Sequence, residues 1–175
     1  MPIDESRSFK PVNLALLTVS DTRTLADDSS GDLLAARIEA AGHKLAARAI
    51  GRDDRDGIIN ILRPWIDDQR IDAVITTGGT GLTGRDVTPE ALDQVKDKDI
   101  PGFGELFRWL SYESIGVSTV QSRACAVVAR GTYIFALPGS NGAVKDGWDN
   151  ILAHQLDSRF RPCNFVELMP RLRET

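Results

Sequence analysis

Hydrophobic and polar positions along the chain alternate between strand-like runs and stretches with helical spacing. The first run, 13–19, is almost continuously apolar, which is typical of a strand buried on both faces of a parallel sheet. Strands are predicted at 13–19, 44–50, 71–77, 124–129 and 132–137.

Segments with apolar residues at helical spacing separate most of these strands. Helices are predicted at 30–41, 54–68 and 141–156, with two more beginning at Thr88 and Pro101. The threonine is expected to cap its helix, with Pro89 at the first helical position. Ser29 followed by Asp32 resembles a capping box for the first helix, and Pro64 should bend the second.

Strands that alternate with helices across short turns predict an α/β layered domain with a mostly parallel sheet. We expect residues 1–175 to form a single domain, in which 1–11 are a loose N-terminal arm. The length is ample for a substantial hydrophobic core.

Composition narrows the classes of function. Apolar residues make up 42% and charged residues 26%, which is ordinary for a soluble protein. The net charge of −4 provides no general attraction for nucleic acid. No apolar run is long enough to span a membrane, and the polar first ten residues lack the apolar stretch of a signal peptide. We therefore expect a cytoplasmic protein whose Cys125 and Cys163 are reduced thiols without a special role.

Three of the predicted turns are rich in Gly, Ser, Thr and Asp. They span 20–31, 78–88 and 138–142, and each follows a predicted strand. Ligands of parallel sheets bind beyond the carboxyl ends of the strands, so we expect these turns to converge on one site. Since the net charge is negative, an anionic ligand must be held there by local donors.

The turn after the third strand, Thr77-Gly-Gly-Thr-Gly81, is the first candidate for anion binding. Its glycines allow several backbone N–H groups to point at one anion. The turn lacks the lysine of a Walker loop and is not a GxGxxG motif, so a tight turn without a ligand is an equally good interpretation. Arg85 and Asp86 follow, a combination that suits a metal-bound triphosphate but also describes a surface ion pair.

Further candidates lie next to the other strands, and each also has a purely structural interpretation. They are Ser20, Asp21 and Asp28 (a capped loop), Asp53 and Asp54 (acids of a first helical turn), Arg123 (a surface residue), and Pro138, Gly139 and Ser140 (a plain N-cap). His43 and His154 are expected to be structural. Glycine loops, carboxylates on a metal and arginine suffice for phosphoryl or nucleotidyl transfer, in which positioning and charge neutralisation do most of the work.

Seven motifs together resemble one known family. They are Leu17-Thr-Val-Ser-Asp-Thr22, Asp28-Ser-Ser-Gly31, Thr76-Thr-Gly-Gly-Thr-Gly81, Arg85-Asp-Val-Thr-Pro-Glu90, Pro101-Gly-Phe-Gly-Glu105, Ser122-Arg123 and Leu137-Pro-Gly-Ser140. In this order they are similar to the molybdopterin-binding MoaB/MogA family, which includes the G domain of gephyrin. The resemblance covers about 13–165, and the stretches 107–113, 118–124 and 161–165 look most like the MoaB branch.

The resemblance implies a three-layer, Rossmann-like fold and a reaction. Active members transfer AMP from Mg-ATP to the terminal phosphate of molybdopterin, release pyrophosphate, and pass the product on to receive molybdate from a partner protein. Asp53 and Asp86 would be the catalytic acids around Mg²⁺ and the nucleotide. The rest of the site would be Ser20, Asp21, Asp28, Gly78, Gly79, Thr80, Gly81, Arg85, Arg123, Pro138, Gly139 and Ser140. Family members form trimers or pairs of trimers, and the apolar face of the Phe103–Leu110 helix could serve such packing, although core burial is its other interpretation.

One departure from the family pattern concerns phosphate binding. Many active members carry a basic residue after the motif that ends at Ser140, whereas this chain has Asn141-Gly142, and Lys145 comes a helical turn later. The retained Asp-Val-Thr-Pro-Glu segment favours catalysis. Two alternatives remain: a non-catalytic molybdopterin-binding or scaffold protein, and an α/β domain that binds another phosphorylated small molecule.

Overall fold

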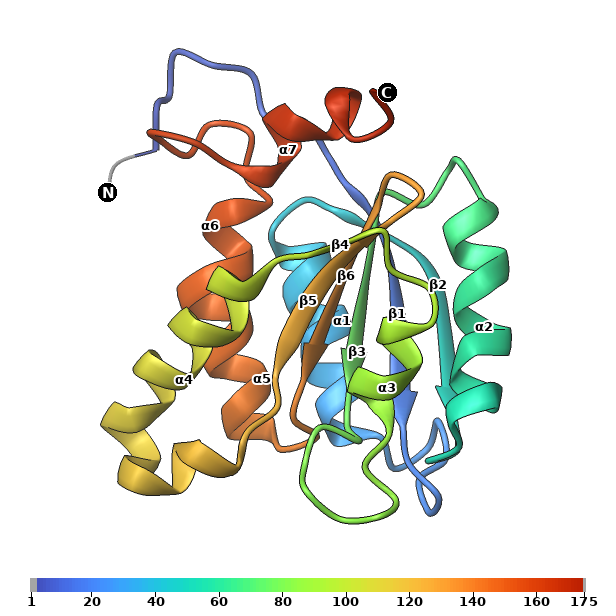
Figure 1. Ribbon diagram of the computed structural model, residues 1–175. Coiled ribbons are helices and arrows are strands. Elements are labelled where there is room, and N and C mark those ends of the chain that lie inside the picture. Colours follow the sequence, from blue (N-terminus) through green and yellow to red (C-terminus); the bar gives the residue numbers. More distant parts are fainter. Residues whose placement is uncertain (1–2, 175) are drawn as a thin grey trace.

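The computed structural model describes residues 3–174 and contains a six-stranded sheet with helices on both faces (Figure 1). The strands are β1 (Asn13–Val19), β2 (Lys44–Gly51), β3 (Ala73–Thr77), β4 (Lys98–Asp99), β5 (Cys125–Ala129) and β6 (Thr132–Leu137). The helices are α1 (Ser29–Ala40), α2 (Arg55–Asp67), α3 (Thr88–Asp93), α4 (Pro101–Ile115), α5 (Asn141–Gly147), α6 (Ala153–Gln155) and α7 (Phe165–Leu168). Short 3₁₀ segments, η1 (Gly116–Gln121) and η3 (Met169–Arg171), and a π-helical turn, η2 (Trp148–Leu152), complete them.

The sheet is mostly parallel and has the strand order β2-β1-β3-β6-β5-β4. β1, β2, β3 and β6 run parallel, whereas β5 pairs antiparallel with β6 and β4 antiparallel with β5. Leu14 and Leu16 of β1 pack on the side of α1, α4 and α5, while Ala15 and Leu17 pack on the side of α2. Because both faces of the central strands are buried, their sequences are almost continuously apolar. The predicted three-layer α/β fold is confirmed.

All five predicted strands are present, and the third begins at Ala73 instead of Ile71. The sixth strand, β4, has two exposed residues, too few to produce a recognisable alternation of apolar and polar positions. α2 continues through Pro64 to Asp67. The predicted last helix is interrupted by the π-helical turn η2.

The caps predicted for α1 and α3 are wrong. Val87 is the N-cap of α3, and the Thr88 hydroxyl instead donates a hydrogen bond to the Gly78 carbonyl oxygen at 2.9 Å. The N-cap of α1 is Asp28, whose carboxylate accepts from the Gly31 N–H at 3.1 Å, so the Ser29–Asp32 capping box does not form. The Thr88 hydroxyl and the Asp28 carboxylate both make contacts with residues outside their own helices, and the spacing of residues in the sequence does not predict such contacts.

The expected N-terminal arm makes several contacts with the C-terminal part of the chain. Ile3 forms a bridge with Phe160, the Asp4 N–H donates to the carbonyl oxygen of Arg159, and the Lys10 N–H donates to the Ser158 hydroxyl. Residues 1, 2 and 175, which belong to the expected arm and to the end of the expected domain, lie outside the described residues. Because of these contacts, residues 3–10 are held against the C-terminal part of the chain and do not form a loose arm.

Asp28 is a buried charge at the start of α1. Its carboxylate accepts hydrogen bonds from the Thr18 hydroxyl at 2.7 Å and from the Arg48 guanidinium at 2.8 Å, in addition to the Gly31 N–H. Burial alone would raise the pKa of Asp28, but these hydrogen bonds more than offset it and lower the pKa. The carboxylate therefore links β1, β2 and α1, and the stability it contributes is lost as the pH falls through its lowered pKa.

We expect Asp28→Ala to lower the free energy of unfolding at pH 7 by about 3 kcal/mol or more, because it leaves Arg48 without its buried partner. Urea denaturation measures the difference in the free energy of unfolding between the variant and the wild type. This difference should become smaller in acid, where the wild-type Asp28 carboxylate is protonated. Asp32→Ala is the matched control, since the exposed Asp32 pairs with the same guanidinium and its loss should cost less than about 1 kcal/mol. Equal losses of unfolding free energy in the two variants would contradict the stabilising role of the buried Asp28 carboxylate.

Candidate functional site

The three polar loops meet at one edge of the sheet, the lower edge in Figure 1. β1, β3 and β6 lie side by side in register, with Thr18 paired to Thr77 and Thr77 paired to Leu137. The loops that follow these strands therefore begin at the same level, as the sequence predicted from the parallel order.

Close backbone contacts hold two of these loops together. A Cβ at Gly78 would lie 2.2 Å from the carbonyl oxygen of Val19, and its φ of +105° also requires glycine. The Gly78 N–H donates to the Leu137 carbonyl oxygen at 2.9 Å, and the Thr77 hydroxyl donates to that of Pro138 at 3.1 Å. The 138–142 turn is thus fixed against the start of the 78–88 loop.

Arg123, which lies between η1 and β5, supports the 78–88 loop. Its guanidinium donates to the carbonyl oxygens of Gly81 and Asp86, each at 2.7 Å, and pairs with Glu90 of α3. The Asp86 carboxylate accepts from the N–H and the hydroxyl of Thr83, which lower the pKa of Asp86. Two predicted ligand-binding residues, Arg123 and Asp86, therefore also shape the loop itself.

An ion pair joins the 20–31 loop to the 78–88 loop. The Arg85 guanidinium donates to both carboxylate oxygens of Asp21 at 2.6 to 3.0 Å. These hydrogen bonds lower the pKa of Asp21, which also accepts from the Asp53 N–H at 3.2 Å. The structure thus brings together Asp21, Asp53 and Arg85, three of the predicted site residues.

The remaining predicted residues divide into two groups. Ser20 accepts from the N–H groups of Thr22 and Arg23, and Ser140 caps α5 by accepting from the Ala143 N–H at 3.2 Å. Both lie at the loop edge, whereas Asp28 is enclosed by protein groups and fully buried. Its burial and its hydrogen bonds favour a structural role for Asp28.

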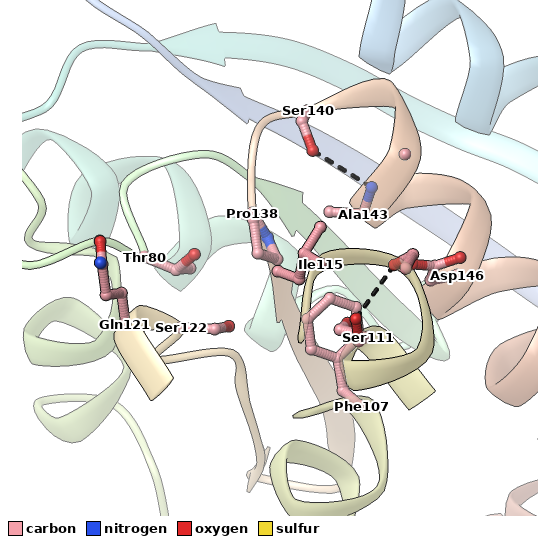
Figure 2. A pocket seen from close by; sticks show the side chains of 13 residues that line it. Thr80, Phe107, Ser111, Ile115, Gln121, Ser122, Pro138, Ser140, Ala143 and Asp146 are labelled. Carbon is pink, nitrogen blue, oxygen red and sulfur yellow. Dashed lines mark hydrogen bonds between the residues drawn. The ribbon is translucent and has the colours of Figure 1, made fainter. Parts of the chain in front are cut away.

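A cavity of about 400 Å³ lies beside the 78–88 loop, on the side of α4 and α5 (Figure 2). Four predicted residues line it, namely Thr80, Gly81, Pro138 and Ser140. Sequence reasoning missed the other lining residues, which are Phe107, Ser111, Ser114, Ile115, Gln121, Ser122, Gly142, Ala143 and Asp146. On α4 these residues have the helical spacing of a core face, so their sequence gave no signal for a cavity.

A second, polar hollow of about 350 Å³ lies on the side of α2 and α3. Its lining includes Asp53, Gly84, Arg85 and Glu90. Within residues 3–174, no group of three or more His, Cys, Asp or Glu side chains has the arrangement of a metal site. A metal ion in this hollow would therefore need oxygen ligands from its substrate as well.

The chain is similar to known proteins over most of its length. Residues 15–158 match the family model described as "Probable molybdopterin binding domain". The chain is 49% identical over 160 residues to molybdenum cofactor biosynthesis protein B of Escherichia coli (strain K12), which covers 91% of this chain and 94% of that protein. The protein of the same name from Bacillus subtilis (strain 168) is 42% identical over 159 residues, or 89% and 94% of the two chains.

Solved structures show the same fold. The crystal structure of a molybdenum cofactor biosynthesis protein B superposes with a TM-score of 0.86 at 36% identity, covering 97% of this chain and all of that chain. The tungsten cofactor synthesizing protein MoaB from Pyrococcus furiosus superposes with a TM-score of 0.78 at 33% identity, covering 94% and 99%. Among the described residues, no helix is both long and apolar enough to cross a membrane. The chain therefore belongs to the molybdopterin-binding domain family that contains these molybdenum cofactor biosynthesis proteins.

Proposed function

We propose that this protein binds molybdopterin and transfers AMP from Mg-ATP to its terminal phosphate, releasing pyrophosphate. The observation that carries the proposal is the Asp53 carboxylate, which lies beside the glycine loop without a counter-ion. It forms no ion pair in the part of the chain that the structure describes, although the Asp21 backbone N–H and the Arg85 charge partly offset the rise in its pKa. Burial raises the pKa of Asp53, and the neighbouring Asp21 and Asp86 charges raise it further.

A cation beside Asp53 would relieve this unfavourable charge. A Cβ at Gly79 would lie 3.3 Å from Asp53 Oδ1, so an ion held by this carboxylate would lie next to the 78–81 backbone, where the proposed phosphates bind. Mg²⁺ in proteins takes one or two carboxylates together with substrate phosphates and water, which suits Asp53 with Asp86 as the second acid. Bound there with ATP, the ion would offset the charge of the reacting phosphates.

The two hollows suggest where the two substrates bind. The polar hollow contains Asp53 and Arg85, so we assign it the nucleotide, and the larger cavity beyond Thr80 and Gly81 receives molybdopterin. The terminal phosphate of molybdopterin would then meet the α-phosphate of ATP at the glycine loop. Arg85 is exposed and held by a single acid, Asp21, so it can turn to a phosphate without leaving a buried charge behind.

In this proposal the protein's own groups have three roles. The 78–81 backbone and Arg85 orient the phosphates, the acids hold the cation, and Ser20, Asp21, Arg123, Pro138, Gly139 and Ser140 fix the loops around them. Reaction needs little covalent chemistry from the protein, because phosphoryl-type transfer depends mainly on positioning and charge stabilisation.

α4 and η1 expose Trp109, Tyr112, Ile115, Val117 and Val120, an apolar surface larger than scattered single residues. We propose that it packs in a homo-oligomer, a trimer or hexamer, in the cytoplasm, and that the adenylylated product passes to a molybdate-inserting partner.

A non-catalytic molybdopterin-binding or scaffold protein is the second candidate. It is favoured by the lack of any Lys, Arg or His among the residues that line the larger cavity. Both candidates require molybdopterin binding, so turnover of ATP separates them.

We expect purified protein to release pyrophosphate from Mg-ATP in the presence of molybdopterin, and Asp53→Asn and Asp86→Asn to lower the rate by about 100-fold or more, since each removes charge stabilisation of the reacting phosphates. A coupled pyrophosphate assay measures turnover, and equilibrium dialysis confirms that molybdopterin still binds. Asp67→Asn is the control, because this exposed acid lies at the other end of α2 and pairs with Arg130. Tight molybdopterin binding without turnover in the wild type would leave the binding protein as the function.

We also expect Asp53→Asn to raise the melting temperature of the ligand-free protein at pH 7 by about 1–3 °C, because it removes a half-buried charge that has no partner. A raised pKa means that the wild type loses stability as the pH rises through it. The gain should therefore shrink as the pH falls and the wild-type carboxyl becomes neutral. Calorimetry at several pH values tests this, and an equal or lower melting temperature at pH 7 would show that Asp53 is already compensated.

A further inference from the structure

The larger cavity has the volume and the mostly apolar lining of a small-molecule site. Apolar groups from Phe107, Ile115, Pro138 and Ala143 form its walls, and its volume of about 400 Å³ is in the range of small-molecule sites. The hydroxyls of Thr80 and Ser111 line it and make no hydrogen bonds within residues 3–174, although both residues are almost fully buried. These polar groups remain available to a ligand.

The charge in this cavity comes from one side chain. Asp146 of α5 is the only charged residue among those that line it. Ser114 donates to Asp146 Oδ2 at 3.4 Å, and across the described chain no Lys or Arg pairs with this carboxylate (Figure 2). A half-buried carboxylate with spare acceptor capacity attracts hydrogen-bond donors and repels anions.

Asp146 and the glycine loop lie at opposite sides of the cavity. Figure 2 shows Thr80, Gln121 and Ser122 on one side and Asp146 on the other. An elongated ligand with donors at one end and a phosphate at the other would therefore place the donors at Asp146. The reverse orientation would bring the phosphate to a carboxylate that no cation offsets.

We propose that Asp146 recognises the aminopyrimidinone edge of the pterin ring and thereby sets the orientation of the bound molecule. This inference rests on the proposed binding of molybdopterin, and it assigns a specificity-determining residue to that site. The edge carries two adjacent donors, the N3–H and the 2-amino group, which match the two oxygens of one carboxylate. Such paired, charge-assisted hydrogen bonds are short and strong, and they discriminate against analogues that lack a donor.

The chemical test compares two phosphate-free probes, 6-hydroxymethylpterin and 6-hydroxymethyllumazine. The lumazine has an oxygen in place of the 2-amino group, so it presents an acceptor to Asp146. We expect the wild type to bind the pterin about 10- to 100-fold more tightly than the lumazine, measured by equilibrium dialysis. Asp146→Asn offers an amide donor to that oxygen, so the preference should disappear or reverse.

Asp149→Asn is the matched control, because Asp149 lies three residues further along, is exposed and pairs with Arg37 outside the cavity. It should keep the wild-type preference, and thermal melting should show that both variants are folded. Since the readout is a ratio between two probes, a general loss of affinity in the variant does not imitate the expected change.

The outcomes separate this inference from the proposed reaction. An unchanged pterin preference in Asp146→Asn, with molybdopterin bound normally, would overturn the role of Asp146 and leave the proposed function standing. A lost preference in a protein that releases no pyrophosphate would support Asp146 and remove only the transfer step. A wild type that binds neither pterin nor molybdopterin would overturn both.

Discussion

The candidate site depends on the close approach of Gly78 to the carbonyl oxygen of Val19. No side chain fits between them, since a Cβ at position 78 would lie 2.2 Å from that oxygen. The same approach allows the Gly78 carbonyl to accept from Thr88 and the Gly78 N–H to donate to Leu137. Backbone contacts and the Thr88 hydroxyl therefore fix the 78–88 loop against the 138–142 turn and the end of β1, independently of the charged side chains.

The charged side chains of these loops largely neutralise one another. Arg85 pairs with Asp21, and Arg123 pairs with Glu90, so most loop charges have a protein partner. Asp53 is an exception, since it forms no ion pair within the described residues, and its burial and the neighbouring acids raise its pKa. Exceptions of this kind are expected at functional sites, where a residue is retained for a ligand although it destabilises the ligand-free fold.

The sequence predicted what depends on local patterns and missed what depends on tertiary packing. Strands buried on both faces leave continuous apolar runs, and the polar loops after them could be placed at one edge from the parallel order alone. The sequence did not show that Arg48 of β2 would enclose Asp28, because this contact joins two residues that are distant in the chain. Asp146 was missed because its place in the cavity depends on how α5 packs against α4, and the two are separated by β5 and β6.

The distribution of charge, more than shape, distinguishes the two hollows at this edge. The larger cavity contains one carboxylate and no cationic lining residue, whereas the polar hollow is lined by two arginines, Arg55 and Arg85, and by four acids, Asp53, Asp54, Asp56 and Glu90. A phosphate-bearing ring that enters the larger cavity therefore lowers its electrostatic energy by pointing its phosphate away from Asp146 and toward the glycine loop. The same orientation brings that phosphate toward the proposed nucleotide. Recognition of the ring and alignment of the reacting groups would thus follow from a single arrangement of charges, although no basic side chain lines the larger cavity.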